Sequence, residues 1–146
     1  MNLDKLREEL TVDEGCKYEI YLDHLGLATF GIGHLVTEAD PEHGQPVGTE
    51  VSEERVKEVF EEDVAVTLDE CEKLWESFSE LPEEVQLICA NMMFNMGRPR
   101  LSGFKKFNAA VEAGDWEGAA DEMIDSRWYR QVTNRAERLV QRMRAV

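Results

Sequence analysis

The stretch at residues 52–78 carries an apolar side chain at nearly every third or fourth position, and this constrains the fold more than any other part of the chain. Its apolar positions are Val56, Val59, Phe60, Val64, Leu68, Cys71, Trp75 and Phe78. The spacing places them on one stripe of an α-helix. Ser52 is a typical N-cap residue, and acidic residues follow it, as the positive end of a helix dipole favours. We therefore expect one long helix within residues 52–80, long enough to join two lobes.

Helical patterns also occupy the first residues and the second half of the chain. Asn2 is placed to cap a helix whose leucines recur at helical spacing and which stops before Gly15. Pro82 and Gly97 bound another apolar pattern, since proline suits a first turn and glycine a helix end. Later helical patterns surround Phe104, Phe107, Val111, Trp116, Met123, Leu139 and Met143. The second half is thus predicted to be entirely helical.

In residues 17–32 the apolar residues recur with a different period from that of a helix. Tyr18, Ile20 and Leu22 alternate with polar residues, "DHLG" is rich in turn formers, and "LATFGI" resumes an extended run. This pattern predicts a β-hairpin, which a loop at residues 38–48 separates from the long helix. The fold class that follows is α+β, mostly helical, with a small N-terminal hairpin or sheet.

The charge of the chain excludes some classes of function. There are 31 acidic and 16 basic residues, giving a formal net charge of -15. Nucleic-acid binding needs clustered basic side chains, so we expect no nucleic-acid partner. No stretch approaches the roughly 20 apolar residues that span a bilayer, and the N-terminus lacks signal-peptide features. We therefore expect no membrane insertion, and synthesis in the cytoplasm.

Cofactor and metal motifs are absent from the sequence. His24, His34 and His43 have a spacing that matches no familiar ligand pattern. The "GIGH" motif at residues 31–34 lacks the frame of a glycine-rich phosphate loop. The three cysteines lack close C-x-x-C spacing, which favours reduced structural thiols. We expect no metal and no cofactor.

Carboxylates remain as candidates for chemistry. Glu14 ends the first helix beside a glycine, and Asp23 lies in the turn of the hairpin. Cleavage of a glycosidic bond needs one carboxyl group as a general acid and a second as an anion or base on the opposite face. A structural interpretation competes with this one, with Glu14 in water, Asp23 making an Asx turn and Thr29 serving as a strand former. Spacing alone favours the structural interpretation.

Several motifs in a fixed order resemble the T-even bacteriophage lysozymes, the phage-type lysozyme family of glycoside hydrolases. The frame is Glu14, eight residues, Asp23, five residues and Thr29, followed by "GIGH". "NMMFNMG" at residues 91–97, "GF" at 103–104 and "SRWYRQVTNRAER" at 126–138 continue the similarity. The resemblance covers nearly the whole chain. It implies one lysozyme domain at residues 1–146, with an N-terminal lobe at 1–55, a connecting helix at 52–80, and a helical lobe at 81–146 that includes helix 1–14.

The resemblance implies roles for eight residues. Glu14 would be the general acid that protonates the glycosidic oxygen between N-acetylmuramic acid and N-acetylglucosamine. Asp23 and Thr29 would position and activate the water, with inversion. Among the remaining positions, Leu35 and Phe94 would bind the saccharide, whereas His34, Asn95 and Arg135 would support the site, Arg135 by pairing with the acid.

Some positions depart from the family pattern. Asn95 stands where the family commonly has the longer glutamine amide. Phe107 and Glu122 replace small or neutral polar residues at other cleft positions. The best-known members are also basic, whereas this chain is strongly acidic.

The expected partner is peptidoglycan, and the expected state is a monomer. The enzyme would stay in the host cytoplasm until lysis, reach the cell wall with the help of a holin, and lyse the host. Two alternatives stay open at this point. A lytic transglycosylase would use the acid without activating water, and a vestigial hydrolase would serve as a wall-binding or virion component.

Overall fold

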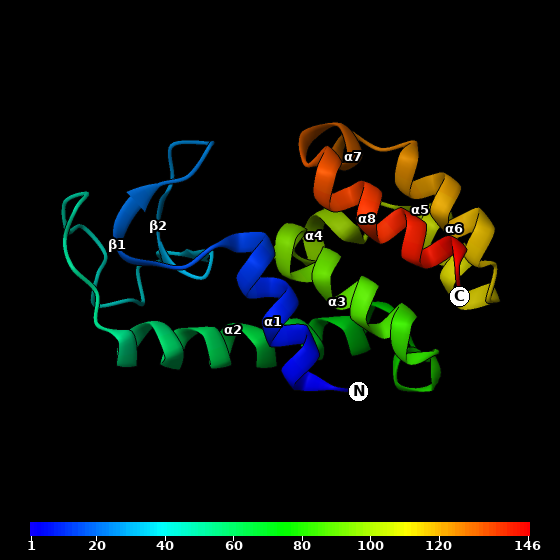
Figure 1. Ribbon diagram of the computed structural model, residues 1–146, viewed down its shortest axis with the longest axis horizontal. Coiled ribbons are helices and arrows are strands. Elements are labelled where there is room, and N and C mark those ends of the chain that lie inside the picture. Colours follow the sequence, from blue (N-terminus) through cyan, green and yellow to red (C-terminus); the bar gives the residue numbers. More distant parts are fainter. The chain divides into compact units, whose positions relative to one another are not determined.

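The computed structural model describes residues 1–146, which form two compact units. We call Arg7–Val66 the sheet unit, and Met1–Leu6 together with Thr67–Val146 the helical unit. The strands, all in the sheet unit, are β1 (Lys17–Leu22), β2 (Ala28–Gly31) and β3 (His34–Leu35). The helices in chain order are α1 (Leu3–Glu14), α2 (Glu53–Leu74), α3 (Glu83–Met96), α4 (Arg98–Leu101), α5 (Lys105–Ala113), α6 (Trp116–Ile124), α7 (Arg127–Gln131) and α8 (Thr133–Arg144). Figure 1 shows these elements along the chain, and their proportions confirm the predicted α+β, mostly helical class.

The sheet of the sheet unit is antiparallel, in the order β1-β2-β3. Its β1–β2 hairpin was predicted, whereas the two-residue strand β3 was not. One face packs on the unit's core, where Ile20 and Phe30 are fully buried with Val51, Val56 and Val59. Side chains alternate across a strand, so the neighbours of Ile20 and Phe30 lie on the opposite face.

The start and end of α1 and the start of α2 lie where the sequence predicts them. The carboxamide Oδ1 of Asn2 accepts a hydrogen bond from the Lys5 amide at 3.1 Å, and Gly15 leaves α1 with a φ of 76°. The hydroxyl of Ser52 accepts from the Arg55 amide at 3.1 Å and so caps α2. These polar groups satisfy amides that the first helical turn leaves unpaired.

The long helix ends earlier than the apolar repeat. α2 stops at Leu74, and residues Phe78–Glu80 form a short 3₁₀ helix, η1. Phe78 nevertheless stays buried, because its ring stacks on Trp75 with the ring centroids 6.2 Å apart. An apolar spacing of three suits both helix types, so the sequence pattern could not mark the change.

The helical unit is built around α3, most of whose side chains are buried. Met92, Met93 and Met96 belong to this core, as expected for apolar residues at helical spacing. Helix α6 packs between α5 and α8 in the same unit (Figure 1). The one-turn helices α4 and α7 were not predicted. No helix combines the length and apolar character that a bilayer crossing requires.

Candidate active site

The face of the sheet opposite the core carries a row of three side chains. Tyr21 pairs with Thr29 across β1 and β2, and Thr29 pairs with Leu35 across β2 and β3. Directly paired residues point to the same face, so the three side chains are neighbours. Tyr21 is half-buried, Thr29 is 4% exposed and Leu35 is 47% exposed. Two predicted site residues thus lie side by side, next to a tyrosine that was not predicted.

Asp23 occupies the turn that joins β1 to β2. Its Oδ1 accepts hydrogen bonds from the amides of Leu25 at 2.8 Å and Leu27 at 2.9 Å. This is the Asx turn of the structural interpretation. It also fixes the carboxylate and leaves Oδ2 to accept from another donor, so the structural and chemical roles are compatible.

Thr29 is tied to the same turn through Leu27. The Thr29 hydroxyl donates its hydrogen to the Leu27 carbonyl at 2.9 Å, and the Asp23 amide donates to that carbonyl at 2.9 Å. A hydroxyl has one hydrogen and two lone pairs, so Thr29 Oγ1 keeps its acceptor capacity. The backbone of Leu27 therefore holds Asp23 and Thr29 with acceptor oxygens available.

Glu14 is the last residue of α1 and lies against the turn between β2 and β3. A methyl group built on Gly33 would come within 2.6 Å of Glu14 Oε1. Gly33 has a φ of +65°, a conformation that side chains disfavour. Glycine at this position of "GIGH" thus permits both the turn and the close approach of the carboxyl group.

The phenol of Tyr21 links Glu14 to Asp23 electrostatically. Burial raises the pKa of Tyr21, and the negative charges of Glu14 and Asp23 raise it further. The charges of both carboxylates therefore act on one hydroxyl of the sheet unit.

His34 fastens β3 to α2 and to the loop after β3. Its Nδ1 lies 2.7 Å from an oxygen of Asp63, and its Nε2 lies 2.9 Å from an oxygen of Asp40. Arg55 continues the network, with its guanidinium 3.4 Å from Asp40 and 2.9 Å from Glu42. Burial lowers the pKa of His34, but its two carboxylate partners outweigh this effect and leave the pKa raised. The ring supports the turn that carries Gly33 and Leu35.

Phe94, Asn95 and Arg135 belong to the helical unit. Asn95 Oδ1 accepts a hydrogen bond from the indole of Trp128 at 2.7 Å, which fixes the shorter amide at this position. Arg135 is 8% exposed, and its Nε donates to Asn91 Oδ1 at 2.8 Å. Phe94 is half-buried on α3.

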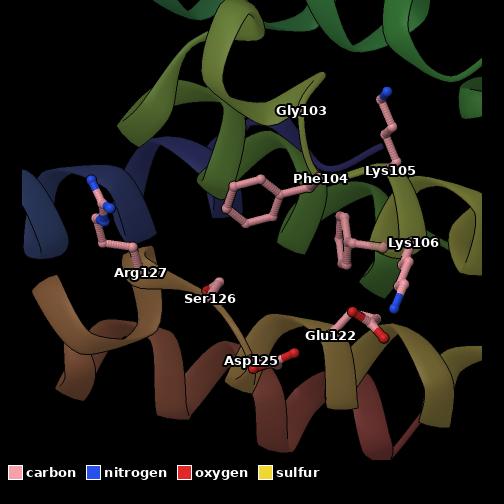
Figure 2. A pocket seen from close by; sticks show the side chains of 9 residues that line it. Gly103, Phe104, Lys105, Lys106, Glu122, Asp125, Ser126 and Arg127 are labelled. Carbon is pink, nitrogen blue, oxygen red and sulfur yellow. The ribbon is translucent and has the colours of Figure 1, made fainter.

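The two substituted positions, Phe107 and Glu122, line a pocket of about 310 Å³ in the helical unit. Phe107 is 1% exposed, and its ring packs edge-on against Trp75 and Phe104. Figure 2 shows Glu122 on the wall opposite Phe104, with the Lys106 ammonium group directed toward it. The other charged lining residues are Lys105, Asp125 and Arg127. Both positions therefore lie in the wall of one pocket, to which Phe107 contributes an aromatic ring and Glu122 a carboxyl group.

No group of three or more His, Cys, Asp or Glu side chains lies close enough to hold a metal ion. Cys16 is exposed, Cys71 and Cys89 are buried, and all three are free thiols.

Sequence comparisons give the family. The chain is 31% identical to a probable T4-type lysozyme 2 of Dictyostelium discoideum, over 94% of this chain and 92% of that protein. It is 28% identical to the pre-baseplate central spike protein Gp5 of Enterobacteria phage T4, over 92% of this chain and 26% of that protein. It is 29% identical to the peptidoglycan hydrolase gp36 of Pseudomonas phage phiKMV, over 94% of this chain and 15% of that protein. The phage lysozyme family matches residues 12–145, and the chain therefore belongs to that family.

Proposed function

We propose that the protein is a muramidase, which hydrolyses the β-1,4 bond between N-acetylmuramic acid and N-acetylglucosamine in peptidoglycan. Membership of the phage lysozyme family and the similarity to a peptidoglycan hydrolase support this activity. The observation that carries the proposed mechanism is the turn at Leu27, which fixes Asp23 and Thr29 with oxygens available to accept hydrogen bonds.

The water would be held by two acceptors. A water molecule that donates one hydrogen to Asp23 Oδ2 and the other to Thr29 Oγ1 directs a lone pair away from both, toward the sugar. Glu14 gives its proton to the glycosidic oxygen, whose bond to the anomeric carbon breaks. The oxygen of the water forms the new bond to that carbon, and Asp23 takes the proton that the water loses. This is the inverting course, in which acid and base act from opposite faces of the sugar.

The remaining residues have supporting roles in the proposal. Leu35 and Phe94 contact the saccharide, and His34 holds the turn next to Leu35. Asn95 and Arg135 support Glu14, as the family resemblance implies. The protein acts as a monomer, is released to the cell wall with a holin, and lyses the host.

Substitution of the proposed acid tests the activity. Glu14→Gln keeps the shape of the side chain but has no proton to give, so hydrolysis of purified peptidoglycan falls by at least about 100-fold. Wild-type and variant proteins are compared at equal concentration, with wall binding and thermal unfolding measured in parallel. A wild type that binds the wall but cleaves it no faster than Glu14→Gln would instead support the vestigial alternative.

Analysis of the products distinguishes the mechanism from that of a lytic transglycosylase. Hydrolysis gives reducing N-acetylmuramic acid ends, whose initial anomer is α if the β bond is inverted. A lytic transglycosylase gives 1,6-anhydro ends, because the sugar's own hydroxyl replaces water. Anhydro ends as the main product would contradict the role proposed for Asp23 and Thr29.

A further inference from the structure

The backbone of Leu27 joins the two residues proposed to hold the water, while its side chain has no role in the mechanism above. The Leu27 carbonyl accepts hydrogen bonds from the Asp23 amide and from the Thr29 hydroxyl, each at 2.9 Å. The Leu27 amide donates to Asp23 Oδ1, also at 2.9 Å. All three bonds use main-chain atoms of Leu27, so they do not depend on which side chain it carries. The choice of leucine at this position therefore needs a separate explanation.

The side chain of Leu27 lies on the same face of the sheet as Thr29. We call this face, which is opposite the core, the site face. Leu22 pairs with Ala28, and the hydrogen bond from the Asp23 amide to the Leu27 carbonyl continues the pairing of β1 with β2 by one residue. Side chains alternate along a strand, so residues 27 and 29 point to one face and residue 28 to the other. Ala28 packs against the core of the unit, which agrees with this assignment.

Leu27 and Leu35 form an apolar rim beside Thr29. Leu27 is the neighbour of Thr29 along the chain on the site face, and Leu35 is its partner on β3. Thr29 is 4% exposed, whereas Leu27 is 45% and Leu35 is 47% exposed. The two leucines therefore stand out from the sheet on two sides of a threonine that is almost covered. A ligand that reaches a water molecule at Thr29 meets these two side chains.

The charge of the sheet unit indicates which kind of ligand suits this rim. The unit has 16 acidic and 4 basic residues, so it repels an anionic lipid surface. The sugar rings of a glycan strand are uncharged, and their C–H and N-acetyl methyl groups are apolar. Removing such groups from water against a leucine is favourable and needs no complementary charge. A glycan therefore fits the rim better than a membrane does.

We propose that Leu27 is a substrate-binding residue, whose side chain packs together with Leu35 against the apolar surface of the sugar that the water attacks. The inference rests on the proposed function, in which the anomeric carbon of that sugar faces the water held by Asp23 and Thr29. The contact exists before the glycosidic bond breaks, so it stabilises the ground state and the transition state alike. It therefore affects KM and leaves kcat nearly unchanged.

Leu27→Asn tests the contact, because it replaces an apolar side chain by a polar one of similar shape and keeps the main-chain hydrogen bonds. We expect KM on soluble peptidoglycan fragments to rise about fivefold, while kcat changes less than about twofold. Leu27→Met, which stays apolar and has a similar volume, should keep KM within about twofold of the wild type.

Leu22 provides a matched control at the end of β1. It is 54% exposed, and it pairs with Ala28, so alternation assigns it to the face opposite that of Leu27. Leu22→Asn should therefore leave both constants unchanged. Melting temperatures are measured for all variants, to separate loss of the contact from loss of the fold.

Binding is measured separately from cleavage in the Glu14→Gln background. Adding Leu27→Asn to Glu14→Gln should raise the dissociation constant for the same fragments about fivefold, and adding Leu22→Asn should not. Wild type and Leu27→Asn are also mixed with phosphatidylglycerol vesicles, and neither should co-sediment. Vesicle binding by the wild type that Leu27→Asn abolishes would assign the leucine to a lipid surface and overturn the inference.

The remaining outcomes separate this inference from the function on which it rests. An active wild type, an inactive Glu14→Gln and a Leu27→Asn variant with unchanged KM would overturn the inference alone. A fall in kcat without a rise in KM would overturn it too, because the substitution would then act through the turn. An equal rise in KM for Leu22→Asn would contradict the assignment to the site face. A wild type that does not cleave peptidoglycan would overturn the proposed function, and the inference with it.

Discussion

Gly33 shows how one backbone position limits the candidate site. Its positive φ and its closeness to Glu14 are separate demands, and each excludes a side chain for a different reason. The positive φ concerns stability, whereas the approach to the carboxyl group concerns chemistry. A substitution at Gly33 can therefore be compared with the same substitution at a glycine that has a positive φ but no neighbouring side chain.

Gly33→Ala is expected to lose activity beyond its effect on stability. The left-handed conformation costs an Ala residue about 1 kcal/mol, and the added methyl also displaces the Glu14 carboxyl group. We expect kcat to fall at least about tenfold. Gly44→Ala is the control, because Gly44 has a φ of +84° but nothing within 4 Å of an added methyl. It should lose similar stability and keep its kcat; an equal loss of kcat in both would contradict the contact with Glu14.

His34 gives the sheet unit a pH-dependent stability. Its folded-state pKa is raised above the ordinary 6.5, so its ion pairs stabilise fully below that pH and are lost as pH rises through the folded pKa. For Asp40, burial raises the pKa, but hydrogen bonds from Thr37 and His34 outweigh this and leave it below the ordinary 3.8. The contribution of Asp40 is therefore present above that value and is lost in acid.

His34→Gln should thus destabilise the protein most between about pH 4 and 6.5, and progressively less in more alkaline solution. The measurement is the free energy of unfolding by urea across this range, for wild type and variant. His43→Gln, at an exposed loop position, is the control and should give only a small difference. A constant difference for His34→Gln from pH 5 to 9 would show that the pKa of His34 is the same in the folded and unfolded states, against the raised pKa.

At the scale of elements, the first turns of α2 support the sheet. Val56 packs against Gly31 of β2, where an added methyl would lie 3.0 Å from Val56 Cγ1. Val59 joins Val56 in the core behind the sheet. The cap at Ser52 therefore stabilises the helix end on which the core face of the sheet rests.

Ser52→Ala should lower the free energy of unfolding by about 1 kcal/mol, since it removes the acceptor for the Arg55 amide. Ser52→Thr, which keeps a hydroxyl acceptor, should lose much less. Because the cap lies behind the sheet and not on its site face, kcat per folded molecule should stay the same in both. A loss of kcat at full stability would indicate that the helix end positions the site directly.

The elements that the sequence predicted are those with local causes. Asn2, Ser52 and Gly97 mark helix ends through their own hydrogen bonds or conformation, so the sequence alone could locate them. β3 consists of two residues and forms only because β2 offers a pairing edge, which is a tertiary cause. The helices α4 and α7 are single turns, too short for an apolar period to develop.

The residues of the candidate site also divide into those that a sequence motif can indicate and those that only tertiary pairing brings into place. Glu14, Asp23 and Thr29 are proposed as catalytic because a resemblance of ordered motifs outweighed their ordinary local interpretation. Tyr21 was missed because it alternates with Ile20 like any strand residue. Its relation to Glu14 and Asp23 depends on the pairing of β1 with β2 and on the folding back of the turn, which no short spacing encodes.

At the scale of the whole molecule, the negative charge is unevenly distributed. The sheet unit, with 16 acidic and 4 basic residues, carries a formal charge of -12 of the total of -15. The helical unit has the other 15 acidic and 12 basic residues, a formal charge of -3. The proposed catalytic carboxylates thus lie in the more acidic unit. Its repulsion of an anionic cell wall should slow encounter, most of all at low ionic strength.

Lysis of whole cells is therefore expected to rise with salt up to a few tenths molar, where the Debye length falls below about 8 Å and screening removes the repulsion. Turbidity loss is measured from about 10 to 500 mM salt, with hydrolysis of small, soluble peptidoglycan fragments as the control. A small fragment carries far fewer charges than the wall and meets much weaker repulsion, so its hydrolysis should rise far less. Replacing the exposed acids Glu54 and Glu62 by Gln should increase lysis mainly at low salt. Lysis that only falls from low salt upward would show that attraction to the wall by local basic residues outweighs the net charge.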